Sequence, residues 1–390
     1  MYAPRKLEEL AADEPYAIVG GPFGSKLTSA DYVETGIPVI RGTNLNGGRY
    51  LTETDFVYVT EQKAREDLFG NLAHPGDIVF TQRGTLGQVA LIPVDARFDT
   101  YIVSQSQMKM TVDPHKADPR FIYYCFSSQD TVKKIINQNA SSGVPHINLA
   151  VLRNFTILLP ELNAQQRIAD FLAPYDDLID NNRRRIALLE NAARLLYREW
   201  FVYLRFPGHQ HSRIKDGVPE GWMQKSLGSV LNLQRGFDLP QNDRVSGDIP
   251  VYGSTGIVGT HNASRVSAPT LITGRSGSLG SVCYVDQPCW PLNTALWLTE
   301  VKDTSIYFAY HLLQELNLAK FNSGASVPTL DRKVVHAQSV VIPPQPLVGL
   351  FDEQVKHLFA QSKTLLRQNE QLTQARDLLL PRLMNGEIKV

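Results

Sequence analysis

The segment from Asn163 to Trp200 places apolar residues at alternating steps of four and three. The positions of this seam are Ile168, Leu172, Tyr175, Ile179, Asn182, Ile186, Leu189, Ala193, Leu196 and Trp200. This spacing is typical of an α-helix that packs along another helix, and the rod would be roughly 55 Å long. Because so long a rod cannot bury its seam against itself, it needs a partner helix. Pro174 lies inside it, and we expect the helix to kink or restart there.

The partner helix is encoded in the same chain. The same spacing recurs at Phe351, Val355, Leu358, Ser362, Leu365, Asn369, Leu372, Arg376 and Leu379. Further segments match between the two halves: Val144–Asn148 with Val327–Asp331, Ile157–Pro160 with Val340–Pro343, and more loosely Gly36–Val39 with Asp248–Val251 and Arg83–Gly87 with Arg275–Gly280. The chain therefore contains an internal repeat, and each copy is a globular domain followed by a long helix.

These patterns predict an α+β fold in which two mixed α/β domains are joined by two long helices. The predicted boundaries are 1–160 for the first domain, 161–204 for the first helix, 205–221 for a linker, 222–346 for the second domain, 347–380 for the second helix and 381–390 for a C-terminal tail. Arg120 to Asn139 is predicted to be helical, and Pro381 is expected to end the second long helix.

Composition favours ordered domains, since 43% of residues are hydrophobic and only 20% are charged. The formal net charge is zero. Proteins that bind DNA without a partner usually carry more Lys and Arg than Asp and Glu, because phosphate neutralisation supplies much of their affinity. Either this chain does not bind nucleic acid, or a partner contributes much of the positive field. No apolar run approaches the roughly 18 residues of a membrane span, so we predict no membrane association.

The motifs of common catalytic centres are missing from the sequence. It holds no G-x-S-x-G, no H-E-x-x-H and no phosphate-binding G-x-x-x-x-G-K-[ST]. Its cysteines, Cys125, Cys283 and Cys289, lack a metal-ligand spacing, and we expect them to be reduced thiols in a cytoplasmic protein. The acidic pair Asp176–Asp177 is placed by the heptad pattern on the solvated back of the helix. We predict no metal and no catalytic residue.

Polar residues follow several short predicted strands. In the first domain they are 41–44, 82–83 and 104–107, and in the second domain they are 234–236, 252–256, 275–278 and 293–294. A single polar strand end is most often an ordinary turn. Several of them in both copies favour a surface that faces a ligand.

Taken together, these residues resemble the specificity (S) subunit of Type I restriction-modification systems over nearly the whole chain. The resemblance rests on Gly21–Lys26 followed by Gly36–Gly42, on Gln166–Leu172 through Asn182–Arg184 to Trp200–Phe201, on Pro219–Trp222 and on the two-copy plan. It implies a non-catalytic protein whose two globular domains are target recognition domains, each contacting half of a bipartite site in double-stranded DNA. The two long helices would pack antiparallel, as a pseudo-two-fold coiled coil.

The resemblance also implies partners. Two methyltransferase (M) subunits would dock on the helices, and restriction (R) subunits would complete the complex. S-adenosylmethionine, ATP and Mg would belong to those subunits, so no cofactor is expected in this chain. Two recognition patches one turn of DNA apart, roughly 34 Å, would meet the same face of the duplex, and rods of this length can span that distance.

For the DNA contacts we predict the strand-end residues Lys26, Arg41, Thr43, Arg83, Thr85, Gln105, Asn148, Gln234, Arg235, Ser254, Arg275, Ser278 and Asn293. Arginines such as Arg83 and Arg275 suit guanine edges. The amides of Gln105, Asn148, Gln234 and Asn293 suit adenine. Lys26 and Arg41 are expected to hold phosphates. On the helices, the predicted partner-docking residues are Ile179, Asn182, Ile186, Leu189, Leu365, Asn369 and Leu372.

Two other classes of function stay open at the level of sequence. A two-headed scaffold that binds protein or carbohydrate ligands would also use two domains on a coiled-coil spacer, and zero net charge favours it slightly. An enzyme with a dispersed active site is disfavoured by the missing motifs.

Overall fold

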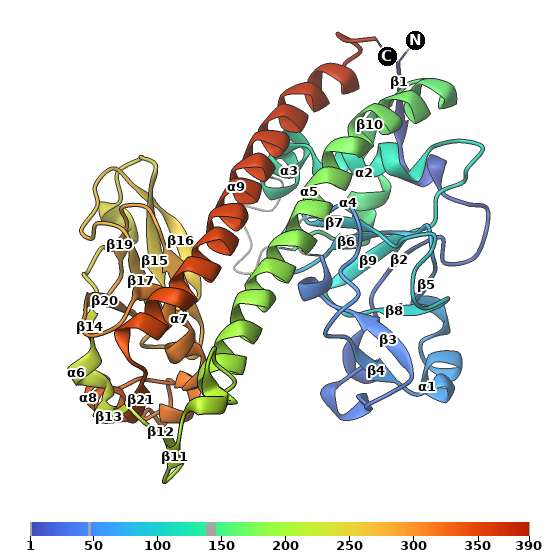
Figure 1. Cartoon of the computed structure of the whole chain (residues 1–390). Coiled ribbons are helices and arrows are strands. Elements are labelled where there is room, and N and C mark those ends of the chain that lie inside the picture. The colour runs from blue at the N-terminus through green and yellow to red at the C-terminus, as the bar shows by residue number, and fades with distance from the viewer. Residues whose placement is uncertain (1, 46–47, 138–145, 390) are drawn as a thin grey trace. The chain divides into compact units, whose positions relative to one another are not determined.

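The computed structural model of the 390-residue chain describes residues 2–45, 48–137 and 146–389. The chain divides into two compact units. Unit 1 comprises Met1–Arg184 and Leu365–Val390, and unit 2 comprises Arg185–Thr364. The two long helices, α5 (Leu162–Tyr197) and α9 (Gln345–Met384), therefore each contribute one segment to either unit (Figure 1).

Unit 1 contains two four-stranded sheets. The first has the order β2-β9-β6-β7 with antiparallel neighbours, and the second has the order β4-β3-β8-β5 with β3 and β8 parallel. The strands of the two sheets are β2 Ile18–Gly20, β3 Ile37–Ile40, β4 Val57–Val59, β5 Leu72–Ala73, β6 Ile78–Thr81, β7 Val89–Leu91, β8 Tyr101–Val103 and β9 Gln107–Met110. A separate antiparallel pair joins β1 (Ala3–Lys6) to β10 (Thr156–Leu159).

The shorter helices of unit 1 are α1 (Glu61–Glu66), α2 (Pro119–Ser127), α3 (Gln129–Asn137) and α4 (Leu149–Arg153). The helical prediction for 120–139 is confirmed for 120–127 and 129–137, with a break at Ser128, whose backbone is extended between α2 and α3. Its hydroxyl accepts the amide of Thr131 and restarts the chain as a helix. Residues 138–139, and the repeat match at Val144–Pro145, lie outside the described residues.

Unit 2 repeats this plan. Its main sheet has the order β14-β20-β17-β18, again antiparallel, and a second sheet has the order β16-β15-β19 with β15 and β19 parallel. The strands are β11 Ile214–Lys215, β12 Val218–Pro219, β13 Met223–Ser226, β14 Leu231–Arg235, β15 Ile249–Gly253, β16 Gly256–His261, β17 Thr270–Gly274, β18 Val282–Val285, β19 Trp290–Pro291, β20 Ala295–Val301 and β21 Ser339–Ile342. The helices are α6 Leu227–Val230, α7 Ile306–Glu315 and α8 Arg332–His336. Strand β2 thus corresponds to β14, β9 to β20, β6 to β17 and β7 to β18, which confirms the internal repeat.

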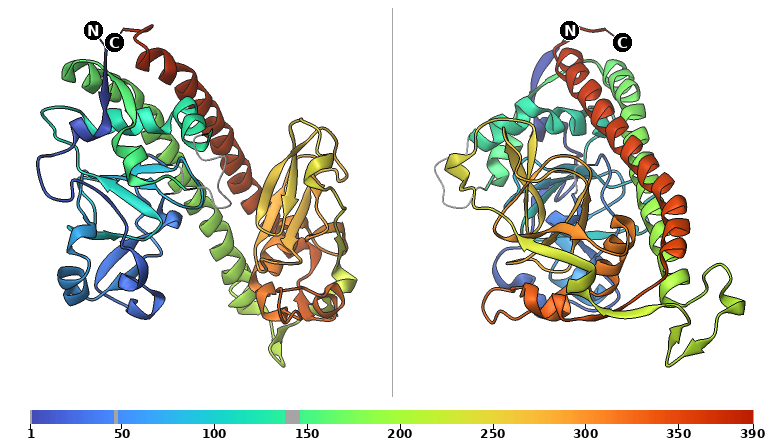
Figure 2. Two further views of the ribbon diagram at one scale, coloured as in Figure 1. Left: turned by 180° about the vertical axis from the view of Figure 1, so that it is seen from behind. Right: turned by 60° about the vertical axis from the view of Figure 1, so that its left-hand side comes forward.

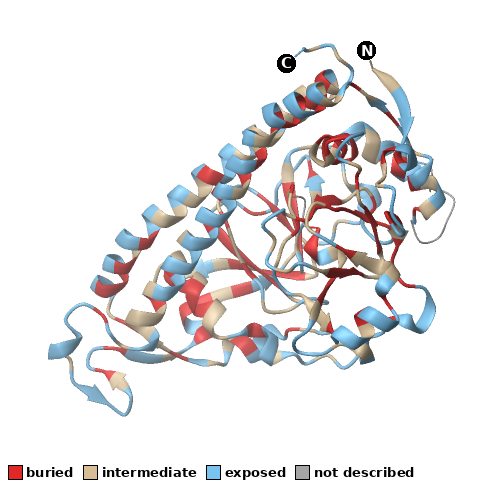
Figure 3. Ribbon diagram, turned by 90° about the vertical axis from the view of Figure 1, so that its right-hand side faces the viewer, coloured by how far each residue is buried: buried red, intermediate tan, exposed pale blue. Residues whose placement is uncertain are grey.

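The halves of α5 and α9 that belong to unit 1 lie side by side and antiparallel in both views (Figures 1 and 2). Ile168, Leu172 and Ile179 are buried, as the heptad pattern predicts. The polar interruption of the seam is satisfied, because Nδ2 of Asn182 donates to Oδ1 of Asn369 at 3.0 Å. Figure 3 shows the alternation of buried and exposed positions along both helices.

In unit 2 the other halves of the helices join the core. Ala193 and Tyr197 of α5 belong to one buried cluster with Phe351 and Val355 of α9, and the ring centres of Tyr197 and Phe351 lie 5.9 Å apart. The predicted pair of long antiparallel helices is confirmed.

At both prolines the helix continues, so neither the expected restart at Pro174 nor the expected end at Pro381 occurs. Helix α5 continues through Pro174 without a break, and Nη1 of Arg49 supports the adjacent turn by donating to the carbonyl of Ala173 at 3.3 Å. Helix α9 runs on to Met384 with Pro381 inside it, because Leu383 is still buried in the core of unit 1. A proline removes one helical hydrogen bond, and buried contacts on either side can offset that loss. In the predicted linker, β11 and β12 form a short antiparallel hairpin.

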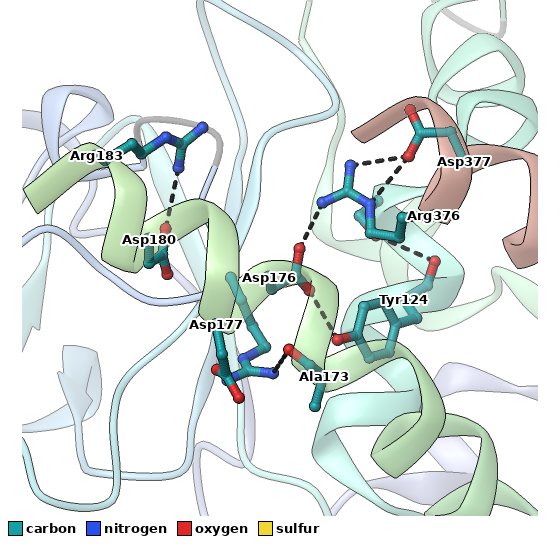
Figure 4. A network of polar contacts seen from close by, with 10 residues as sticks. Tyr124, Ala173, Asp176, Asp177, Asp180, Arg183, Arg376 and Asp377 are labelled. Atoms are coloured by element: carbon teal, nitrogen blue, oxygen red, sulfur yellow. Dashed lines mark hydrogen bonds and ion pairs between the residues drawn. The ribbon is translucent and has the colours of Figure 1, made fainter. Parts of the chain in front are cut away.

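The prediction that Asp176 is solvated is also wrong. Its side chain is only 3% exposed, and its Oδ1 lies 2.6 Å from Nη1 of Arg376 on α9. The hydroxyl of Tyr124 on α2 donates to the other carboxylate oxygen at 2.7 Å (Figure 4). Asp177, by contrast, is exposed and pairs with Arg49. The heptad pattern does not show the globular domain packing on what would otherwise be the free back of the helix.

Candidate nucleic-acid interface

The ends of β2, β3 and β6 in unit 1 meet around the turn between β8 and β9. The amide of Ser104 donates to the carbonyl of Ile40 at the end of β3, at 3.1 Å. The amide of Gln82, just beyond β6, donates to the carbonyl of Ser106 at 2.7 Å. Gly21, just beyond β2, approaches the same turn so closely that a Cβ there would lie 1.9 Å from the carbonyl oxygen of Ser104. Only glycine permits this approach.

Unit 2 repeats this arrangement bond for bond. The amide of Leu292 donates to the carbonyl of Tyr252 at 2.8 Å, and the amide of Arg275 donates to that of Thr294 at 2.8 Å. A Cβ on Gly236 would lie 2.3 Å from the carbonyl oxygen of Leu292. Each unit therefore gathers its polar strand ends on one surface, as the repeated polar clusters in the sequence indicate.

The shared hydrogen bonds define which residues are equivalent. Gln105 corresponds to Asn293, and both were predicted from the sequence. Arg275 corresponds to Gln82, whereas Arg83 corresponds to Ser276, since the amides of Arg83 and Ser276 bond to the same turn in their units. Arg83 and Arg275 thus occupy neighbouring rather than equivalent positions. In this register the loops after β6 and β17 have equal length, with Gly84 and Gly87 matching Gly277 and Gly280, so the looser sequence match that paired Arg83 with Arg275 was shifted by one residue.

Several of the predicted contacts in unit 1 are exposed side chains. They are Lys26, Thr43, Arg83 and Thr85, and the last two lie on the loop between β6 and β7. Their exposure leaves them available to a ligand.

Other predicted contacts in unit 1 brace the protein. Nη2 of Arg41 donates to the carbonyl of Asp55 at 2.6 Å. Nε2 of Gln105 donates to the carbonyls of Gly24 and Leu27 at 2.8 and 2.9 Å, which fixes the loop that carries Lys26. The amide of Gln105 has therefore already used its donors within the chain.

Asn148 begins α4. Its side-chain oxygen accepts the amide of Val151 at 2.9 Å, so it is an N-cap with an exposed side chain. Asp331 caps α8 in the same way in unit 2, by accepting the amide of Lys333 at 2.8 Å. The repeat match between Asn148 and Asp331 therefore reflects helix capping.

In unit 2 the predicted residues Gln234, Arg235 and Arg275 come together in an open groove. The groove is lined by Gln234, Arg235, Gly236, Phe237, Asp238, Arg275, Leu296, Ser323, Thr329, Leu330, Asp331 and Arg332. Nη1 of Arg275 donates to the carbonyl of Asn293 at 3.1 Å, and Nδ2 of Asn293 donates to Asp238. Arg235 lies 3.8 Å from the same carboxylate. The remaining two predicted residues lie near the loop after β17: Ser254 is half-buried and Ser278 is exposed.

Two charged residues of this groove, Asp238 and Arg332, are not among the contacts predicted from the sequence. Arg332 is exposed and follows the capping Asp331 directly, and Asp238 lies three positions after Arg235. Their closeness to predicted residues in the sequence was the available signal.

The residues predicted to dock partner subunits lie mostly inside the helix pair. Ile179, Asn182, Ile186 and Leu365 are buried, and Leu189, Asn369 and Leu372 are half-buried. The exposed large apolar side chains of the same helices are others: Phe171, Leu178, Leu188, Leu195, Leu350, Leu366 and Leu378. The seam residues therefore hold the two helices together.

Among the described residues, no three or more His, Cys, Asp or Glu side chains cluster as metal ligands would. In the same residues, no helix is both long and apolar enough to cross a membrane.

Comparison with known proteins identifies the family. The family described as "Type I restriction modification DNA specificity domain" matches residues 23–191 and 219–364. The specificity subunit of the Type I restriction enzyme MjaIX from Methanocaldococcus jannaschii is 22% identical over 374 residues, which cover 87% of this chain and 85% of that protein. The specificity subunit of the Type I restriction enzyme HindI from Haemophilus influenzae is 20% identical over 398 residues, covering 80% and 86% respectively.

A solved structure has the same fold. The S subunit of a Type I restriction-modification system from M. genitalium aligns with a TM-score of 0.51 and 19% sequence identity, covering 98% of this chain and 96% of that one. The two segments that match the family, residues 23–191 and 219–364, fall in the two copies of the repeat.

Proposed function

Because the chain belongs to the family of Type I restriction-modification DNA specificity subunits, whose role is DNA recognition and not catalysis, we propose that it reads a bipartite site in double-stranded DNA, one half with each unit. The observation that supports this most is the duplicated strand-end surface. In each unit the ends of three strands and one turn meet in the same hydrogen-bonded arrangement. Two such surfaces in one chain suit a target made of two separated halves.

The helices supply a spacer of suitable length. Helix α5 has 36 residues and α9 has 40, which correspond to roughly 54 and 60 Å at 1.5 Å per residue. Both exceed the roughly 34 Å of one turn of DNA. We propose that methyltransferase subunits, one for each half of the repeat, dock on the outer faces of these helices, and that restriction subunits join the complex.

The formal net charge of zero is consistent with DNA binding in which this chain and the methyltransferase subunits both contact the phosphates. If the methyltransferase subunits close around the duplex, they supply much of the phosphate neutralisation that this chain lacks. S-adenosylmethionine, ATP and Mg would be bound by the partner subunits, and the complex would act in the cytoplasm. A scaffold for protein or carbohydrate ligands is the weaker alternative, since the family match points to DNA.

The proposal is tested by sequencing methylated bases in host DNA with and without this gene, with the methyltransferase gene present in both. We expect adenine methylation at one bipartite motif that disappears when this gene is deleted. Methylation that stays unchanged, or a motif with a single undivided half, would contradict the proposal.

The salt dependence of DNA affinity tests whether the methyltransferase subunits supply part of the phosphate contacts. Binding of a duplex that contains the motif should fall more steeply with salt for the complex than for this chain alone. Equal slopes would show that the partner adds no phosphate contacts.

A further inference from the structure

The groove of unit 2 carries three arginines at positions where unit 1 has no charge. The hydrogen bonds that align the two units pair Gly21 with Gly236 and Gln82 with Arg275, and the two helix caps align α4 with α8. The residues that replace Arg235, Arg275 and Arg332 in unit 1 are therefore Gly20, Gln82 and Leu149. The two recognition surfaces share a backbone but differ in charge.

Arg275 differs from the other two arginines in how it is held. It is half-buried in the wall of the groove, and its Nη1 donates to the carbonyl of Asn293 at 3.1 Å. That bond uses one of the five N–H groups of the guanidinium, so the side chain is oriented while further donors remain to face the groove. Arg235 and Arg332 are exposed.

A held guanidinium discriminates between bases. Guanine presents two acceptors, O6 and N7, in the major groove, and a fork of two N–H groups matches both. Adenine presents a donor beside N7, which faces an arginine donor unfavourably. An exposed arginine on a mobile side chain is instead suited to a phosphate, which carries no sequence information.

We propose that unit 2 reads a guanine in its half of the DNA site through Arg275, with Arg235 and Arg332 holding the flanking phosphates, and that unit 1 reads its half without an arginine at these positions. This rests on the proposed function and adds to it the kind of base that one unit selects. Asp238 supports the arrangement, since it accepts from Asn293 and lies beside Arg235.

The test uses the complete chain in complex with its methyltransferase subunits and a library of random DNA duplexes. The variants are Arg275→Lys and Arg275→Gln. Lysine keeps the charge but lacks the two-pronged donor, so both variants should lower the preference for guanine at one position of one half-site by about 10-fold or more. The other half-site should be selected as before. The matched control is Lys333→Gln, which removes an exposed charge next to Arg332 and should leave the preference unchanged.

A second measurement needs no variant that could misfold. Replacing the selected guanine by 7-deazaguanine removes the N7 acceptor, and the unaltered complex should then bind about 10-fold more weakly. Arg235→Gln and Arg332→Gln should each weaken binding of all sequences alike and reduce the slope against salt by about one ion.

The outcomes distinguish a failure of the role proposed for Arg275 from a failure of the proposed function. If the unaltered complex selects a bipartite motif but Arg275→Lys retains the full guanine preference, Arg275 is a phosphate contact and this inference is overturned. The same holds if 7-deazaguanine has no effect. If the unaltered complex selects no motif at all, the proposed function fails and the inference fails with it.

Discussion

Asp176 of α5 and Arg376 of α9 form a buried ion pair, with Oδ1 and Nη1 2.6 Å apart and side chains 3% and 15% exposed. Because Tyr124 of α2 donates to the same carboxylate, the pair ties the helices to the globular part of unit 1. In the repeat register, which pairs Ile168 with Phe351, the equivalent positions in unit 2 are Phe359 and Ala193. Both are packed in the apolar cluster of that unit. One copy of the repeat thus joins its helices to its domain through charge, and the other does so through apolar and aromatic packing.

Replacing Asp176 by asparagine should destabilise unit 1 by about 3–5 kcal/mol, because Arg376 would stay buried without its full partner. The measurement is urea unfolding of the complete chain, followed by a probe in unit 1. The matched control is Asp170→Asn on the same helix, whose 65% exposed carboxylate pairs with Arg120 and should contribute less than about 1 kcal/mol. A double change to Asp176→Leu with Arg376→Met should recover most of the stability. A loss no larger than that of the control would show that the buried pair contributes little.

The pair Asn182–Asn369 should behave as a coupled unit. Asn182→Leu alone removes a hydrogen-bond partner from Asn369, which keeps only a long bond of 3.4 Å to the carbonyl of Ile179. We expect this single change to cost about 1–3 kcal/mol, and the double leucine variant to be neutral or stabilising. Thermal unfolding of both single variants and the double variant measures the coupling. Strictly additive effects would show that the two amides act independently.

Two glycines should respond in opposite directions to alanine. In Gly21→Ala the new methyl would meet the Ser104 carbonyl, so the turn between β8 and β9 must shift, at a cost of about 2 kcal/mol or more. We expect reading of one half-site to be lost as well. In Gly349→Ala, inside α9, the methyl meets nothing within 4 Å, and helix propensity should stabilise the chain by about 0.5–1 kcal/mol. Unfolding midpoints and motif selection by the two variants test this contrast.

Much of this architecture follows from the sequence alone. The heptad seam predicts two paired helices, because burial every three or four residues is a local signal, and the repeat predicts two copies of one domain. The seam does not reveal that Asp176 is buried, since the residues that cover it, Tyr124 and Arg376, lie far away in the chain. For the same reason the bracing roles of Arg41 and Gln105 could not be predicted. Their partners are backbone carbonyls, which every residue type carries, so the sequence does not indicate these hydrogen bonds.

The stability of unit 2 should depend on pH through His311. This residue of α7 is 2% exposed and lies among aromatic rings, with the ring centre of Tyr310 4.9 Å away and that of Tyr197 5.5 Å away. Burial, with a smaller contribution from the charge of Arg194, lowers the pKa of His311 from 6.5 to about 4. Between these pH values the unfolded chain binds a proton that the folded chain does not, so this stability is complete above about pH 6.5 and is lost as the pH falls towards 4. The loss amounts to about 3 kcal/mol, and His311→Phe should abolish most of it. The control His357→Gln changes an exposed histidine of α9 and should leave the pH profile as it is. The measurement is the urea midpoint of unit 2 between pH 4 and 8, and an unaltered slope in His311→Phe would assign the dependence to another group.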